Sequence, residues 1–226
     1  MNKDMLVVVH CYAGDQALVE ATLPLYLHHG CPVLILSPED SPVRIANPEV
    51  VCQTAGKAGW KGPHTTERQV AHWKIAAALP ARYYLLHDSD SVCLTPELPA
   101  YLREPGTDLW CNVLCHEVEH ETTDEPNFVP PYFVSRSVLL RMIERADALI
   151  VNDDGAEWAH DGRNAIDGLY VTVAKHLGLI VHTFPDGATT WPPSTQNLGR
   201  DVARGARFVH GFKDRWTLDH LLKVYV

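Results

Sequence analysis

An apolar run that ends in two carboxylates constrains this chain more than any other feature of its sequence. Residues 83–87 are strand-like, and Asp88, Ser89 and Asp90 follow them directly. Side chains two residues apart in an extended segment point to the same side, so Asp88 and Asp90 converge while Ser89 points away. Paired oxygen ligands suit hard cations such as Mg²⁺ or Mn²⁺. The pattern predicts a buried strand with a metal site at its end, and the alternative is an acidic turn that closes the strand.

The length and charge of the chain limit what surrounds that strand. The 226 residues suit one large α/β domain, and we expect a single domain over residues 1–226. The formal net charge of -9 disfavours the nucleic-acid backbone as a main source of binding energy, although a local basic groove is compatible with it. The sequence shows no leader pattern and no apolar run near the roughly 20 residues that cross a bilayer. We therefore expect a soluble, cytoplasmic protein without a membrane partner.

Alternating strand-like and helix-like segments predict a parallel sheet with helices on its faces. A strand, helix, strand unit at the start places a ligand site at the carboxyl ends of the strands. Pro24 is expected to kink or interrupt the first helix, and residues 53–63 are rich in glycine and predict a loop. The pattern favours strands at 6–9, 33–36, 83–87, 109–115, 179–184 and 207–210, and helices at 16–29, 65–79, 137–146 and 165–177.

The helix expected at 65–79 carries polar side chains just before the acidic strand. These side chains are Arg68, Gln69, His72 and Lys74. They either face a ligand or form a solvated outer face of the helix, and the spacing leaves both interpretations open.

A second polar segment follows the last expected strand. His210, Gly211 and Lys213 combine an imidazole that can ligate a cation, a glycine that lets backbone amides approach a phosphate, and a positive charge. Taken alone, the segment is equally compatible with an ordinary turn. Together with the acidic pair, it predicts a site for a metal ion and a diphosphate.

These segments, in this order, resemble the GT-A fold glycosyltransferases, which have a Rossmann-like, mostly parallel central sheet flanked by helices. The chain resembles in particular the glycogenin and bacterial galactosyltransferase group, which ends in His-x-x-Gly-x-Lys-Pro-Trp. Here that pattern is shortened to the seven residues from His210 to Trp216. The retaining stereochemistry of the group is therefore not carried over.

The resemblance implies a hexosyltransferase that uses Mn²⁺ or Mg²⁺ and a nucleotide-sugar donor, a UDP-sugar by family analogy. It implies roles for residues at four places in the chain. Asp88, Asp90 and His210 match the metal ligands; Asp88 also matches a ribose contact; Gly211 and Lys213 match the diphosphate contacts; His10 and Tyr12 lie in the segment that holds the nucleoside; Gln69 and Lys74 lie in a helix that reaches toward the donor.

Asp167 is the candidate catalytic residue. It lies in the first turn of the helix expected at 165–177, where relatives carry a catalytic or acceptor-binding acid. Its alternative role is to complement the helix dipole. The acceptor hydroxyl is not readable from the sequence, and a protein, a glycan and a hydroxylated DNA base all stay open, as does the oligomeric state.

A competing pattern occupies residues 116–120, where His116-Glu117-Val118-Glu119-His120 matches the His-Glu-x-x-His signature of zinc peptidases. That signature requires a helix, whereas the preceding residues are strand-like. A third possibility is a non-catalytic nucleotide-binding module, which would use the same residues as the transferase and differ from it only in turnover.

Overall fold

The computed structural model describes residues 4–59, 63–94, 108–114, 117–118, 121–122, 127–151, 165–184, 189–190 and 208–210, and for some of these, among them Asp167 and His210, the backbone only. The strands are β1 (Met5–His10), β2 (Val33–Ser37), β3 (Val50–Thr54), β4 (Tyr83–Asp88), β5 (Ser91–Cys93), β6 (Leu109–Leu114), β7 (Glu117–Val118), β8 (Glu121–Thr122), β9 (Asn127–Ser135), β10 (Val181–Thr183), β11 (Thr189–Thr190) and β12 (Phe208–His210). The helices are α1 (Gln16–His28), α2 (Pro63–Ala78), α3 (Arg136–Val151) and α5 (Ala165–Leu177), with a 3₁₀ turn, η1 (Ala13–Asp15), before α1.

A seven-stranded sheet in the order β10-β6-β9-β4-β1-β2-β3 forms the centre of the fold. All neighbouring strands run parallel except β9, which is antiparallel to β4 and to β6. The predicted α/β class with a mostly parallel central sheet is confirmed. The inner strands are apolar at nearly every position because helices cover both faces, as parallel sheets require.

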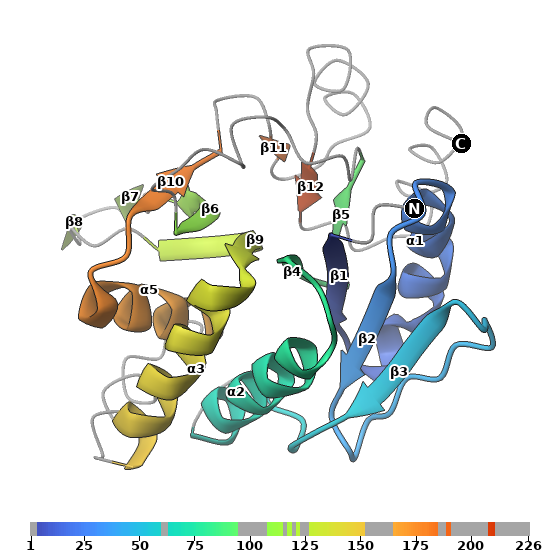
Figure 1. The fold of residues 1–226 in the computed structure, drawn as a ribbon, viewed down its shortest axis with the longest axis horizontal. Coiled ribbons are helices and arrows are strands. Elements are labelled where there is room, and N and C mark those ends of the chain that lie inside the picture. The colour runs from blue at the N-terminus through green and yellow to red at the C-terminus, as the bar shows by residue number, and fades with distance from the viewer. Residues whose placement is uncertain are drawn as a thin grey trace.

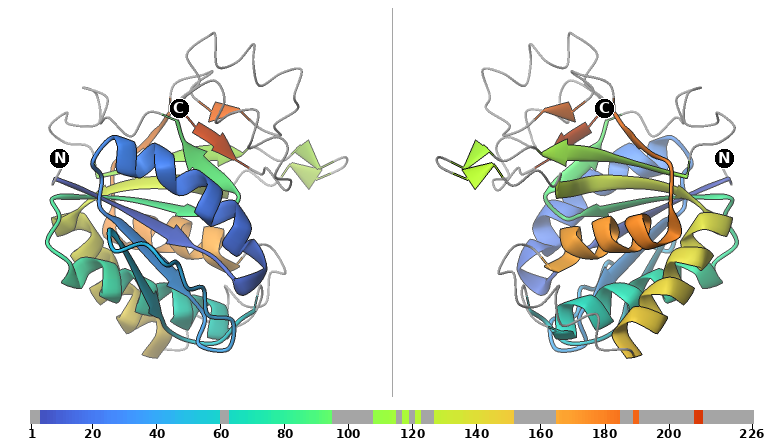
Figure 2. Two further views of the ribbon diagram at one scale, coloured as in Figure 1. Left: turned by 90° about the vertical axis from the view of Figure 1, so that its right-hand side faces the viewer. Right: turned by 90° about the vertical axis from the view of Figure 1, so that its left-hand side faces the viewer.

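The helices divide between the two faces of the sheet (Figures 1 and 2). Helix α1 covers one face, where Val7 and Val9 of β1 pack with Val19 and Leu23. Helices α2, α3 and α5 cover the other face, where Leu6 and Val8 alternate with the first pair. Because these faces are both buried, the register of β1 is fixed by its core contacts and its last residue, His10, must emerge on the α2 side.

A small sheet, in the order β11-β12-β5, lies beyond the end of β4 (Figure 1). Strand β5 follows β4 after a short turn, and β12 pairs with it antiparallel although more than a hundred residues separate the two in sequence. This pairing brings residues 208–210 next to the strand that follows the acidic turn.

Several elements differ from the sequence predictions, among them two strands of the central sheet and one helix. Strand β3 replaces the first two residues of the loop expected at 53–63, and β9 occupies a central position that the sequence did not indicate. Pro130 and Pro131 obscure β9, because proline is rare in central strands; the paired residues that flank them in the ladders are Val129, opposite Asn112, and Tyr132, opposite Leu86. Helix α1 runs through Pro24 without interruption.

No helix in the described ranges has both the length and the apolar character needed to span a membrane.

Candidate functional site at the carboxyl ends of β1 and β4

His10 and Asp88 end two adjacent parallel strands and are direct partners in the β1–β4 register. Partners in such a ladder point to the same face of the sheet, here the face covered by α2. Both side chains are partly exposed, whereas the residues that precede them in the strands are buried. The pairing of β1 with β4 therefore places an imidazole and a carboxylate side by side at the carboxyl ends of the two strands.

The turn that carries the two carboxylates is anchored through Ser89. Its backbone N–H donates to the carbonyl oxygen of His10 at 2.9 Å, and its hydroxyl donates to Oδ2 of Asp15 at 2.7 Å. Ser89 is 9 % exposed, while Asp88 and Asp90 are partly exposed. The middle residue thus holds the turn to η1 and β1, and its two neighbours stay accessible.

The pairing of β12 with β5 places the backbone of His210 opposite Ser91, the residue after Asp90. Two carboxylates and an imidazole form a donor set that suits Mn²⁺ or Mg²⁺. Among the side chains that the structure describes, no three His, Cys, Asp or Glu groups gather closely enough to hold a metal ion; the side chain of His210 is not among those described. Asp88 and Asp90 supply carboxylate oxygens of the kind that a divalent cation binds, and the backbone of His210 lies opposite the next residue, Ser91.

A buried polar cluster lies beside this edge, under α2. Nε2 of Gln69 is 3.3 Å from Nε2 of His10, and Nδ1 of His10 is 3.0 Å from Nδ1 of His72. An amide nitrogen only donates, so Nε2 of His10 accepts and its proton sits on Nδ1, from which it is donated to His72. Both ring nitrogens of His10 are therefore engaged with α2.

The cluster extends from Gln69 to α5. The hydroxyl oxygen of Tyr170 accepts hydrogen bonds from Nε2 of Gln69 at 3.4 Å and from Nε1 of Trp73 at 2.9 Å. The ring of Tyr170 stacks on Tyr132 of β9 with a centroid separation of 3.6 Å. Gln69, Trp73, Tyr132 and Tyr170 are all buried, and their contacts connect the first half of α5, which begins just before Asp167, to His10 at the end of β1.

Burial keeps both histidines of the cluster neutral. Desolvation, with smaller effects from His72, His87 and Arg68, holds the pKa of His10 well below its ordinary value. Desolvation and the charge of Arg68 lower the pKa of His72 to about 4, against opposing effects of the backbone carbonyls of Ala55 and Ser37. Nε2 of His72 is buried without a hydrogen-bond partner in the described part of the chain.

The shifted pKa of His72 predicts that acid destabilises the fold before most carboxylates titrate. The unfolded chain protonates this residue near pH 6.5 and the folded chain only near pH 4, so between these values the unfolded state binds more protons. The free energy of unfolding should fall by about 1.4 kcal/mol per pH unit for each such histidine as the pH is lowered. Urea unfolding at pH 7 and pH 5 should show a shallower fall for His72→Gln than for the wild type; equal slopes would contradict the assignment.

Arg68 fastens a neighbouring loop instead of facing solvent. Its guanidinium donates to the carbonyl oxygens of Lys57 at 2.7 Å and Gly59 at 2.9 Å, and to the hydroxyl of Tyr12 at 2.8 Å. Tyr12 in turn donates to the Gly59 carbonyl at 3.2 Å. Desolvation raises the pKa of the Tyr12 phenol, with Arg68 opposing the rise. Tyr12 is thus fixed between η1 and the loop, near the predicted nucleoside site.

The four polar residues of α2 divide between two environments. Arg68, Gln69 and His72 are buried, so the solvated-face interpretation does not describe them. Lys74 is exposed and forms an ion pair of 2.8 Å with Asp147 of α3. We therefore leave Lys74 out of the site proposed below. Val70 and Trp73, which lie between and beside them in the sequence, are buried as well, but no spacing pattern distinguishes this arrangement from a solvated face.

Other predicted site residues lie partly or wholly beyond the described ranges. Gly211 and Lys213 lie outside them, and for Asp167 the structure gives only a backbone position in the first turn of α5. Of the zinc-peptidase pattern, Glu117 and Val118 are described; they form β7, which pairs antiparallel with β8. A strand at these two residues is incompatible with the helix that the pattern requires.

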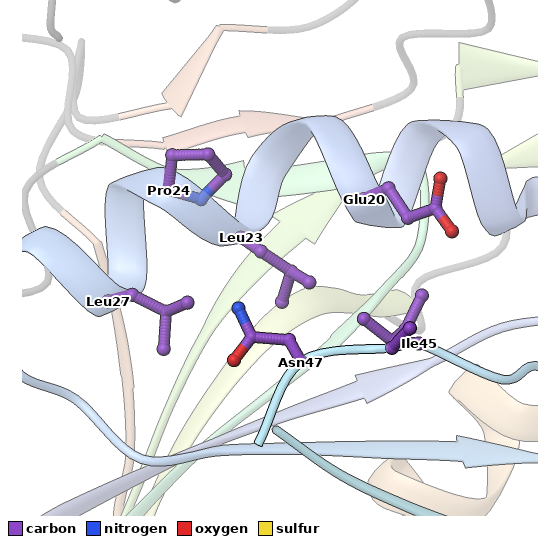
Figure 3. Close-up of a pocket in the computed structure, with 7 residues that line it drawn as sticks. Glu20, Leu23, Pro24, Leu27, Ile45 and Asn47 are labelled. Carbon is purple, nitrogen blue, oxygen red and sulfur yellow. The ribbon is translucent and has the colours of Figure 1, made fainter. Parts of the chain in front are cut away.

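A hollow of about 270 Å³ lies elsewhere, between α1 and residues 45–47 (Figure 3). Leu23, Leu27 and Ile45 give it an apolar lining, and Glu20 supplies its one carboxylate. None of the candidate site residues lines it, and we assign it no ligand.

No protein-family model and no curated protein sequence matches this chain. Among solved structures, the chain is similar to a glycosyltransferase involved in the glycosylation of the major capsid of PBCV-1, with a TM-score of 0.56 and 14 % sequence identity. The similarity covers 97 % of this chain and 99 % of that one. At this identity it establishes a shared glycosyltransferase fold over almost the whole chain.

Proposed function

We propose that the protein is a metal-dependent glycosyltransferase that moves a sugar from a nucleotide-diphosphate sugar to an acceptor hydroxyl. The proposed donor is a UDP-sugar. One observation carries the proposal: the β5–β12 ladder sets His210 beside the Asp88-Ser89-Asp90 turn, at the edge where β1 and β4 end. Ligands of open α/β sheets bind at such edges. The shared fold with a glycosyltransferase supports the same activity.

The chemistry of sugar transfer explains why these residue types are needed. Breaking the bond between sugar and diphosphate leaves negative charge on the diphosphate, and a divalent cation supplies a Lewis acid that stabilises it. Asp88 and Asp90 with His210 would hold that cation, and Lys213 would add a positive charge to the diphosphate. His10 and Tyr12 would border the nucleoside, with Gln69 fixing the His10 imidazole.

Asp167 is proposed as the residue that binds or deprotonates the acceptor hydroxyl. It precedes Tyr170 by three residues on α5, and Tyr170 is joined through Gln69 to His10. Helical residues three apart share a face, which supports placing Asp167 on the site side of α5. A base at this position favours inversion of the sugar, whereas an acceptor-binding role leaves a retaining reaction open.

The acceptor is proposed to be carried by a protein, because the similar solved enzyme takes part in the glycosylation of a capsid. A free glycan and a hydroxylated DNA base are the other acceptor classes to be compared with it.

A donor screen tests the proposal. Purified protein is incubated with a panel of nucleotide-diphosphate sugars and Mn²⁺, and nucleotide release is measured with and without EDTA. We expect release from one donor, which EDTA abolishes and Mn²⁺ restores. Intact donor that stays bound would identify a binding module instead, and peptide cleavage with co-purified zinc would favour a peptidase.

A further inference from the structure

The buried hydroxyl of Tyr26 lies at the base of the turn that carries the two candidate metal ligands. Tyr26 belongs to α1 and is 0 % exposed. Its hydroxyl oxygen is 2.9 Å from Nε2 of His87, the residue before Asp88, and accepts the backbone N–H of Cys93 at 3.0 Å. Tyr26 therefore joins the strand that enters the turn to the strand that leaves it.

The direction of these hydrogen bonds is consistent through the whole group. Nδ1 of His87 is 2.9 Å from the carbonyl oxygen of Asp88, which can only accept, so Nδ1 carries the proton. In the neutral imidazole Nε2 then accepts from the Tyr26 O–H, and the phenol oxygen keeps a lone pair for Cys93. Burial raises the pKa of Tyr26 well above its ordinary value, which keeps this donor protonated.

The turn is thus held at two levels. Ser89 anchors its tip to His10 and Asp15, as described above. Tyr26 anchors its base, on the opposite face of the sheet from Gln69 and His72. Asp88 and Asp90, on either side of Ser89, are partly exposed.

We propose that Tyr26 is a positioning residue for the metal-binding pair: its hydroxyl fixes the spacing of Asp88 and Asp90 by joining His87 to Cys93. This inference rests on the proposed function, in which the two carboxylates bind the cation. Residues that orient metal ligands from behind change metal affinity by about 10- to 100-fold when they are removed. A tyrosine that only filled space would leave the affinity unchanged when its hydroxyl is deleted.

The test compares two tyrosine hydroxyl deletions. Tyr26→Phe removes the proposed link and keeps the ring. Tyr84→Phe is the matched control, since Tyr84 is also 0 % exposed and its hydroxyl donates at 3.1 Å to the carbonyl of Leu79, at the other end of β4. Mn²⁺ affinity is measured by calorimetry, and exchange of the Cys93 amide hydrogen by NMR.

We expect Tyr26→Phe to weaken Mn²⁺ binding about tenfold and to speed Cys93 amide exchange, while Tyr84→Phe changes neither. If Tyr26→Phe fails to fold, His87→Leu breaks the same link from the other side and should weaken Mn²⁺ binding similarly. Equal Mn²⁺ affinity in the wild type and the link-breaking variant would overturn the positioning role alone. Failure of the wild type to bind Mn²⁺ would overturn the proposed function and the positioning role with it.

Discussion

Replacing Asp90 by asparagine should abolish Mn²⁺-stimulated nucleotide release. Asp90 is one of two carboxylates that the anchored turn presents at the edge, and an amide oxygen carries no charge with which to hold the cation. We expect the rate to fall by on the order of 10²- to 10³-fold, the range seen when one group that stabilises developing charge is removed. Calorimetry of the variant should also show no Mn²⁺ dependence of donor binding.

Asp147→Asn is the matched control for this prediction. It removes the same charge from a side chain on α3 that pairs with Lys74 and is 45 % exposed. Surface ion pairs contribute little to stability, so both activity and Mn²⁺ affinity should stay near those of the wild type. Unchanged Mn²⁺ dependence in Asp90→Asn would remove Asp90 from the metal site.

Replacing Gly56 by alanine should destabilise the fold by about 3 kcal/mol, from backbone strain and overpacking together. Gly56 has a φ of +68°, and a Cβ atom there would lie 2.8 Å from Cβ of Arg68. The loop cannot move away easily because Arg68 binds the carbonyls of Lys57 and Gly59 on the same loop. Thermal unfolding should show a fall in Tm of roughly 6–12 °C for a domain of this size.

Alanine variants of two further glycines distinguish the cost of backbone strain from the cost of overpacking. Gly178 ends α5 with a φ of +59° but has nothing within 4 Å of an added Cβ, so Gly178→Ala should cost only the conformational part, about 1 kcal/mol. Gly14 has neither feature, and its alanine variant should stay within about 0.5 kcal/mol of the wild type. Equal melting temperatures for Gly56→Ala and Gly178→Ala would show that the contact with Arg68 costs nothing.

The acidic strand end and the α/β class were predictable because both rest on local patterns. The apolar residues of β1, β2 and β4 predict buried strands. Two aspartates separated by one residue predict a pair of oxygen ligands for a metal ion. The neighbourhood of His210 was predictable only through the family resemblance. Its position beside Ser91 depends on a ladder between distant segments, and no local pattern encodes such a pairing.

The hydrogen bonds that hold the candidate site residues in place could not be predicted, since they depend on tertiary contacts between polar residues. The polar residues of α2 are equally compatible with a solvent-exposed helix face. Only the hydrogen bonds that Tyr170 accepts from Gln69 and Trp73 show why Gln69 is buried. The role of Tyr26 depends likewise on α1 crossing β4 at His87. Strand β9 was missed because Pro130 and Pro131 contradict strand propensity, although they lie between the paired residues Val129 and Tyr132.

The most direct test of the proposed site is an anomalous-scattering crystal structure of the protein with Mn²⁺ and a nucleoside diphosphate. The proposed site predicts one strong anomalous peak bounded by the carboxylates of Asp88 and Asp90 and the imidazole of His210, with the diphosphate on its open side. A peak at another place, or a nucleotide bound at the ends of β1 and β4 without any cation, would contradict it.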